Sequence, residues 1–239
     1  MREKGFGFIP GKTILGKYLI VDRLGGGWEG EVYRICEAAT GIHRAAKFFF
    51  PERNEGNRTL RQYAVKLDRL SACPILLRYC THERCKVRGE DVFFLVSDLV
   101  EGEGLKTYIS GLRGKRIRPF EAMHILHELA AGLESIHAAG EYHGDIHMEN
   151  VLIRRKGIGY DVKMIDFFHR GRQSRTRVVE DIFDIVKVFY DITGGRTHYH
   201  TLPPEAKQIC CGLKRGLVAQ RFPSAARLRQ HLESFSWSG

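Results

Sequence analysis

The stretch Tyr142-His-Gly-Asp-Ile-His-Met-Glu-Asn-Val-Leu-Ile153 decides the fold of this chain. It lies between an amphipathic run that predicts a helix and a short apolar segment that predicts a strand, so we expect a loop here. Asp145 and Asn150 lie five positions apart in this loop, and a second acid, Asp166, follows the apolar run Val162–Ile165. A carboxylate, an amide and a second carboxylate that converge can orient a hydroxyl group and hold Mg²⁺ on the phosphates of a nucleotide.

The composition is that of a globular protein with an excess of positive charge. The 239 residues are 43% hydrophobic and 28% charged, which argues against disorder and suits one or two domains. The formal net charge of +10 suits an acidic partner such as a nucleotide, a nucleic acid, an anionic lipid or an acidic protein. A generally cationic, solvated surface is the simpler interpretation of this charge.

The first twelve residues are polar and rich in glycine, without the apolar centre of a signal peptide. No apolar run has the length needed to span a bilayer. We therefore expect a cytoplasmic protein whose six cysteines are reduced thiols. Cys73, Cys80 and Cys85 are close enough in sequence to hold a metal, but their spacing is not that of a usual zinc site, and buried thiols in a hairpin are the simpler interpretation.

Near the N-terminus, a glycine-rich turn joins two predicted strands. The apolar runs Leu15–Leu24 and Glu31–Ile35 flank Gly25–Gly30, which predicts a strand, a turn and a second strand. Because glycine has no Cβ atom, backbone N–H groups in such a turn can approach phosphate oxygens. The next predicted strand, Arg44–Phe50, carries Lys47 among apolar neighbours, where an ammonium group without an anionic partner would be costly.

These motifs and their order resemble the protein-kinase superfamily. His143-Gly-Asp-Ile, with Asn150 at the matching distance, is similar to the catalytic loop His-Arg-Asp-Leu of that family, and Lys47 matches the lysine of its Val-Ala-Ile-Lys motif. The glycine turn fits the pattern G-x-G-x-x-G-x-V at Gly25, Gly27, Gly30 and Val32. The glycine in place of the catalytic-loop arginine is also found in kinase-like small-molecule phosphotransferases, so the loop alone does not choose the substrate.

Two later motifs extend the resemblance to about Leu232. Asp166-Phe-Phe168 stands where the family has Asp-Phe-Gly, and the run from Asp181 resembles the central helix of the large lobe, whose first aspartate braces the catalytic loop. The tail, with Arg221-Phe-Pro-Ser-Ala, resembles the last helices of bacterial serine/threonine kinases.

The resemblance implies an α+β fold with two lobes in one kinase-like domain. A small antiparallel β lobe over residues 1–97, with a helix at 58–70, is followed by a hinge at 98–104 and a mainly helical lobe at 105–239. A compact bacterial serine/threonine protein kinase is the most similar kind of protein.

The resemblance also implies the site and its ligands, ATP and Mg²⁺. Asp145 would act as the base, Lys47 would hold phosphates, and His147 would donate to the γ-phosphate where the family has a lysine. Asn150 and Asp166 would hold Mg²⁺. The nucleotide would be bound by Leu24, Gly25, Gly26, Gly27, Gly30, Val32, Ala45, Lys47, Ser97, Asp98, Val100 and Leu152.

Several residues depart from the family pattern. The helix at 58–70 has no inward glutamate to pair with Lys47, and Tyr63 occupies that place. Glu29 at the tip of the glycine turn would repel phosphates, and Phe168 in place of glycine would stiffen the hinge of that motif. Only His169–Glu180 separates the metal aspartate from the central helix, which leaves no room for an ordinary activation segment.

The basic segment Arg170–Arg177 is expected to be a solvated loop, although phosphorylation of Ser174 or Thr176 could pair each with neighbouring arginines. We expect transfer of the γ-phosphoryl group to a hydroxyl, most readily a serine or threonine of a protein. A pseudokinase and a small-molecule kinase stay open as alternatives, whereas nucleic-acid binding rests on the charge alone. The acceptor and the oligomeric state are not determined by these patterns.

Overall fold

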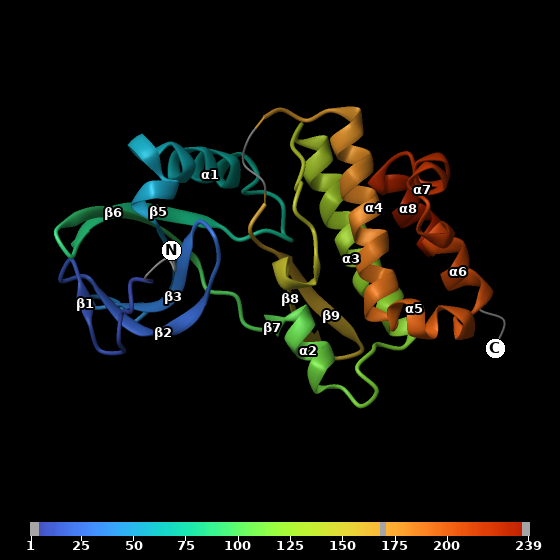
Figure 1. The fold of residues 1–239 in the computed structure, drawn as a ribbon, viewed down its shortest axis with the longest axis horizontal. Helices are drawn as coiled ribbons and strands as arrows, with labels where there is room; N and C mark the ends of the chain where they lie inside the picture. The colour runs from blue at the N-terminus through green and yellow to red at the C-terminus, as the bar shows by residue number, and fades with distance from the viewer. Residues whose placement is uncertain (1–4, 168–170, 236–239) are drawn as a thin grey trace. The chain divides into compact units, whose positions relative to one another are not determined.

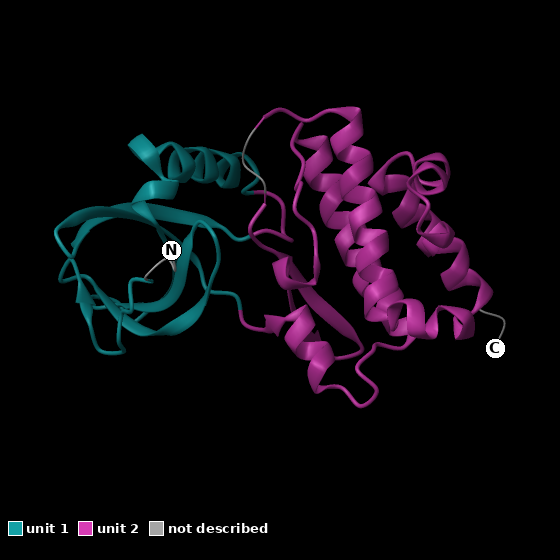
Figure 2. Ribbon diagram, in the orientation of Figure 1, with its two compact units in different colours: residues 1–71, 77–100 teal, residues 72–76, 101–239 magenta. Residues whose placement is uncertain are grey.

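The computed structural model describes residues 5–167 and 171–235, which fold into two compact units (Figures 1 and 2). The first unit comprises residues 1–71 and 77–100, and the second comprises residues 72–76 and 101–239. Residues 72–76 belong to the second unit because Ile75 accepts a backbone hydrogen bond from Met164 N at 2.8 Å.

The first unit is built on one six-stranded antiparallel sheet with the strand order β1-β2-β3-β4-β6-β5. The strands are β1 (Thr13–Ile14), β2 (Tyr18–Gly26), β3 (Gly30–Glu37), β4 (His43–Phe49), β5 (Tyr79–Val87) and β6 (Glu90–Asp98). The helix α1 (Arg58–Arg69) follows β4 after the short 3-10 turns η1 (Pro51–Arg53) and η2 (Glu55–Asn57). One face of α1 is buried through Leu60, Tyr63, Ala64 and Leu67, as the apolar spacing predicts.

An aromatic core lies on one face of this sheet. Burial alternates along β3, where Tyr33 and Ile35 are buried and Val32, Arg34 and Cys36 are half-buried, as expected for a strand with one face in the core. The rings of Phe48 and Phe94 stack at 4.4 Å between their centroids. Phe6 and Phe8, from the N-terminal stretch that was predicted to be polar, are also buried in this core.

The second unit combines a small sheet with a group of helices. Its antiparallel sheet has the order β7-β8-β9, and α3 packs against α4 and α8. In Figure 1, α3 and α4 lie side by side, and the later helices follow α4. The elements are β7 (Glu103–Gly104), α2 (Leu105–Gly111), α3 (Pro119–Ala138), η3 (Met148–Asn150), β8 (Val151–Lys156), β9 (Gly159–Met164), α4 (Arg175–Ile192), α5 (Gly195–His198), η4 (Tyr199–Thr201), α6 (Pro204–Cys210), η5 (Cys211–Leu213), α7 (Arg215–Arg221) and α8 (Ala225–Glu233).

A sheet-rich unit and a helix-rich unit together give the α+β class that the motif order implies. In the part of the chain that the structure describes, no helix has the length and apolar character required to cross a membrane.

The carboxyl group of Asp184 in α4 makes the stability of the second unit depend on pH. Burial, with a contribution from the neighbouring Asp181 carboxylate, raises the pKa of Asp184 from 3.8 to about 6. Between about pH 4 and pH 6 the folded state therefore holds more protons than the unfolded state, and stability falls as the pH rises through this window. We expect Asp184→Asn to raise the free energy of unfolding at pH 7 by about 1–2 kcal/mol, as measured by urea denaturation.

The same variant should show no gain at about pH 4, where the native carboxyl group is protonated. Stability curves of the native chain and the variant that run parallel from pH 4 to pH 7 would contradict this assignment.

Candidate active site

The glycine turn between β2 and β3 combines two crowded glycines, Gly26 and Gly30, with two open ones. A Cβ atom on Gly26 would lie 2.5 Å from Arg23 Nη2 and 3.3 Å from the carbonyl oxygen of Gly30. A Cβ atom on Gly30 would lie 1.9 Å from the carbonyl oxygen of Phe48, so only glycine fits there. Cβ atoms on Gly25 and Gly27 would meet no described atom within 4 Å. Gly27 N donates to Gly30 O at 2.9 Å, which closes the turn. The turn is therefore fixed to β4 at Gly30, while its backbone at Gly25 and Gly27 is open to a ligand.

Lys47 on β4 lies among aromatic rings and an acid. Its ammonium group is 3.0 Å from Glu29 Oε2, and the Lys47 side chain is only 12% exposed. The ammonium also lies 4.7 Å from the ring centre of Tyr63 and 5.5 Å from that of Phe49. Tyr63 thus contacts Lys47 from the place where the family has a glutamate. The ion pair with Glu29 was not predicted, because an acid at the tip of the turn was expected only to repel phosphates.

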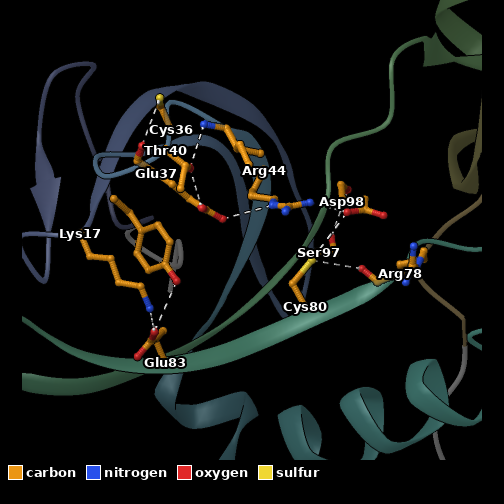
Figure 3. Close-up of polar contacts among 12 residues, drawn as sticks. Lys17, Cys36, Glu37, Thr40, Arg44, Arg78, Cys80, Glu83, Ser97 and Asp98 are labelled. Carbon is orange, nitrogen blue, oxygen red and sulfur yellow. Dashed lines mark hydrogen bonds and ion pairs between the residues drawn. The ribbon is translucent and has the colours of Figure 1, made fainter.

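The predicted adenine-binding residues Ala45, Ser97 and Asp98 lie where the start of β4 pairs with the end of β6. Ala45 pairs with Ser97, and both are buried. Arg44 pairs with Asp98, and its guanidinium group forms ion pairs with Asp98 and with Glu37 (Figure 3).

The Cys80 thiol also lies 3.7 Å from the Asp98 carboxylate. Burial raises the pKa of this thiol, so it stays protonated at neutral pH. The Asp98 side chain is held within the sheet, and its backbone is the part that could meet a base. Val100 and Val32 are half-buried, whereas Leu24 is 48% exposed.

In the second unit, a buried aspartate braces the loop between α3 and η3. Asp181 on α4 is fully buried and accepts hydrogen bonds from His143 N at 2.8 Å and Gly144 N at 2.7 Å. His137 Nε2, at the end of α3, is 2.9 Å from the same carboxylate. The bracing role expected for Asp181 is thus visible in its contacts. The His137 contact was missed, because its spacing on the helix predicted only packing or exposure.

The loop brings Asp145 and Asn150 together. Asn150 Nδ2 donates to Asp145 Oδ2 at 3.0 Å and to the backbone carbonyl of Asp145 at 2.9 Å. The Asp145 side chain is 54% exposed, while Asn150 is buried. Because the amide nitrogen of Asn150 faces Asp145, its amide oxygen is the atom suited to bind a cation. The pair can therefore orient a hydroxyl group through one member and hold a metal through the other.

His147 lies beside the same carboxylate. Its Nδ1 accepts a hydrogen bond from Glu149 N at 3.3 Å, and its Nε2 is 3.7 Å from Asp145 Oδ1. The ring is half-exposed, so it can reach a ligand as well as the base. The role predicted for His147, donation to the γ-phosphate, stays a prediction, and the structure adds that its ring lies beside Asp145.

Asp166 follows β9 in a strained backbone conformation. Its φ of 53° lies in the left-handed region, which is uncommon for a residue with a side chain and is often found at functional sites. Phe167 is buried, and its ring lies 6.2 Å from that of His143. Leu152 on β8 is half-buried, and Phe168 lies outside the described residues. An oxygen each from Asp166 and Asn150 is a donor set that Mg²⁺ accepts.

No group of three or more His, Cys, Asp or Glu side chains among residues 5–167 and 171–235 is arranged to hold a metal. This statement covers Cys73, Cys80 and Cys85, which are free thiols.

The segment before α4 is shorter and more ordered than the sequence suggested. The prediction of a solvated loop over Arg170–Arg177 is wrong from Arg175 on, because α4 begins there with the Ser174 hydroxyl as its N-cap. The Arg177 guanidinium lies 4.4 Å from the ring centre of Tyr142 and hydrogen-bonds its hydroxyl. Gln173 donates to the backbone carbonyls of His137 and Glu141, at 2.9 Å each. These contacts bind the segment to the end of α3.

A family model described as "Protein kinase domain" matches residues 18–186. The chain belongs to this family. Phosphoryl transfer from ATP is the general reaction of protein kinases, which use Mg²⁺ with the nucleotide.

Curated relatives include serine/threonine kinases. The chain is 29% identical over 161 residues to the serine/threonine-protein kinase PrkC of Bacillus subtilis, an alignment that covers 66% of this chain and 23% of the relative. It is 28% identical over 162 residues to myosin-IIIa of Mus musculus, with 66% and 10% covered. Against cell division control protein 2 homolog D of Antirrhinum majus, identity is 26% over 238 residues, with 95% and 74% covered. The kinase domain thus spans a tenth to a quarter of the first two relatives.

The kinase domain of PknI from Mycobacterium tuberculosis has a similar fold. The two structures superpose with a TM-score of 0.66 at 17% identity, over 95% of this chain and 99% of the other. This similarity confirms the two-lobed, α+β kinase-like fold that the motifs implied, with an antiparallel sheet in one lobe and helices in the other.

Proposed function

We propose that this kinase domain transfers the γ-phosphoryl group of Mg·ATP to a hydroxyl group, most readily a serine or threonine of a protein. The observation that carries the proposal is the Asp145–Asn150 pair on a loop braced by Asp181. Positioning and charge neutralisation provide most of the rate in phosphoryl transfer, so a rigid loop with these two groups is the essential requirement. We place the protein in the cytoplasm, whose reducing conditions suit its six free thiols.

Each residue then has a defined task. Lys47 and the backbone of Gly25–Gly30 hold phosphates, while Ala45, Leu152 and the backbone at Asp98 and Val100 hold adenine. Asn150 and Asp166 would hold Mg²⁺, which neutralises negative charge on the phosphates. Asp145 orients the acceptor hydroxyl and accepts its proton. His147 donates a hydrogen bond to the transferred group through Nε2, because its Nδ1 accepts one from Glu149 N.

Two observations favour alternative functions for this kinase domain. The Glu29–Lys47 pair, with no glutamate in the α1 sequence, favours a pseudokinase that binds partners without turnover. The early start of α4 at Arg175 leaves little chain for seating a peptide, which favours a small hydroxyl-bearing acceptor. Both alternatives keep the braced loop, but the pseudokinase transfers no phosphoryl group and the small-molecule kinase transfers it to an acceptor other than a protein.

One assay separates the three functions. The purified chain is incubated with Mg²⁺ and ATP labelled at the γ-phosphate, alone, with a generic acceptor protein, and with a metabolite extract. Label on protein supports the protein kinase, and transfer only with the extract supports a small acceptor. A thermal shift with Mg·ATP and no transfer under any condition would overturn the proposed catalysis and leave the pseudokinase.

A further inference from the structure

The tip of the glycine turn is held by two of its own side chains, one bound to the sheet and the other to η1. Glu29 forms the 3.0 Å ion pair with Lys47, and Trp28 stacks on Arg53 of η1, with 4.0 Å between the guanidinium carbon and the ring centre. The backbone of the tip is also bound, since Phe50 N donates to Glu29 O at 2.9 Å. All of these contacts lie within the first unit.

We propose that Glu29 is an internal competitor for the phosphates of the nucleotide, so that the glycine turn inhibits its own ligand site until this side chain leaves Lys47. The inference rests on the proposed function, because it takes Lys47 as the residue that holds phosphates. It goes further by naming a residue that lowers nucleotide affinity and by defining two states of the turn.

The element that carries the carboxylate indicates that Glu29 competes with phosphates for Lys47 and does not position the lysine for them. A carboxylate offered by α1 would reach the ammonium from the helix, and there the Tyr63 ring lies at 4.7 Å. Glu29 instead reaches the ammonium from the turn whose backbone is proposed to cover the phosphates. A carboxylate oxygen and a phosphate oxygen make the same kind of charge-assisted hydrogen bond to an ammonium group. Glu29 therefore imitates the ligand at the place where the ligand should bind.

The burial of this pair makes the competition effective. The side chains of Lys47 and Glu29 are only 12% and 25% exposed, so water and salt screen their attraction less than that of a surface pair. A nucleotide must break this contact and must also tolerate a displaced carboxylate on the covering turn. Its apparent affinity is the intrinsic affinity multiplied by the fraction of molecules in which the turn is open.

The test compares Glu29→Gln, which removes the charge and keeps the shape, with the native chain. We expect Glu29→Gln to bind Mg·ADP about tenfold more tightly in a calorimetric titration. A change of this size is typical of the coupling between two binding events on one protein. The matched control is Glu52→Gln, which removes the same charge from an exposed residue of η1 and should leave the affinity unchanged. In a background of Lys47→Met, adding Glu29→Gln should change the affinity little, since the shared ammonium is gone.

A second measurement needs no nucleotide. Hydrogen exchange of the Phe50 amide, which donates to Glu29 O, should become faster in Glu29→Gln if the ion pair closes the turn. Native-like or weaker nucleotide binding by Glu29→Gln, in a protein that does bind nucleotide, would overturn the competition alone. Failure of every variant to bind nucleotide would overturn the proposed function and the competition with it, even with faster exchange.

Discussion

Asp145→Asn should lower phosphoryl transfer by about 10²- to 10⁴-fold while the protein stays folded. The change keeps the shape of the side chain but removes the group that orients the acceptor hydroxyl and takes its proton. Asp145 is 54% exposed, so its replacement costs little stability. Transfer of labelled phosphate at saturating Mg·ATP measures the first effect, and urea denaturation measures the second.

The control for this variant is Glu149→Gln in the same loop, whose carboxylate pairs with Lys106 at the surface. It changes the net charge of the loop by the same amount and should keep most of the transfer activity. Nucleotide affinity should be similar in both variants, because Asp145 acts on the acceptor. Residual activity of Asp145→Asn within a factor of ten of the native chain would show that this carboxylate is not the base.

Asp181→Ala should destabilise the second unit by about 3–5 kcal/mol, the usual cost of removing one partner from a buried charged network. The carboxylate is fully buried and accepts hydrogen bonds from two backbone N–H groups, and it lies next to His137. Its removal leaves these donors without the acceptor that compensates for their burial. The midpoint of urea denaturation measures the loss.

Asp191→Ala on the same helix is the matched control, since its partly exposed ion pair with Lys187 contributes only about 0.3–0.5 kcal/mol. At temperatures where Asp181→Ala is still folded, its transfer activity should also fall, because the loop that carries Asp145 has lost its brace. Equal stability of the two variants would mean that the backbone of His143 and Gly144 does not depend on Asp181.

The sequence by itself determined the family, the order of the motifs and the acids of the catalytic loop. These features are local: Asp145 and Asn150 are five positions apart, and the helical or alternating apolar patterns that surround them extend over a few turns or one strand. Local spacing was therefore sufficient to predict that the two side chains meet.

Only the tertiary structure decided which distant side chains pair. Glu29 reaches Lys47, Arg44 reaches Asp98, and His137 reaches Asp181 across 18, 54 and 44 positions of the chain. The N-terminal Phe6 and Phe8 likewise enter the core although their own stretch forms neither a strand nor a helix. Such contacts depend on strand register and helix packing, which are set by the whole fold, and the short patterns of a sequence do not encode them.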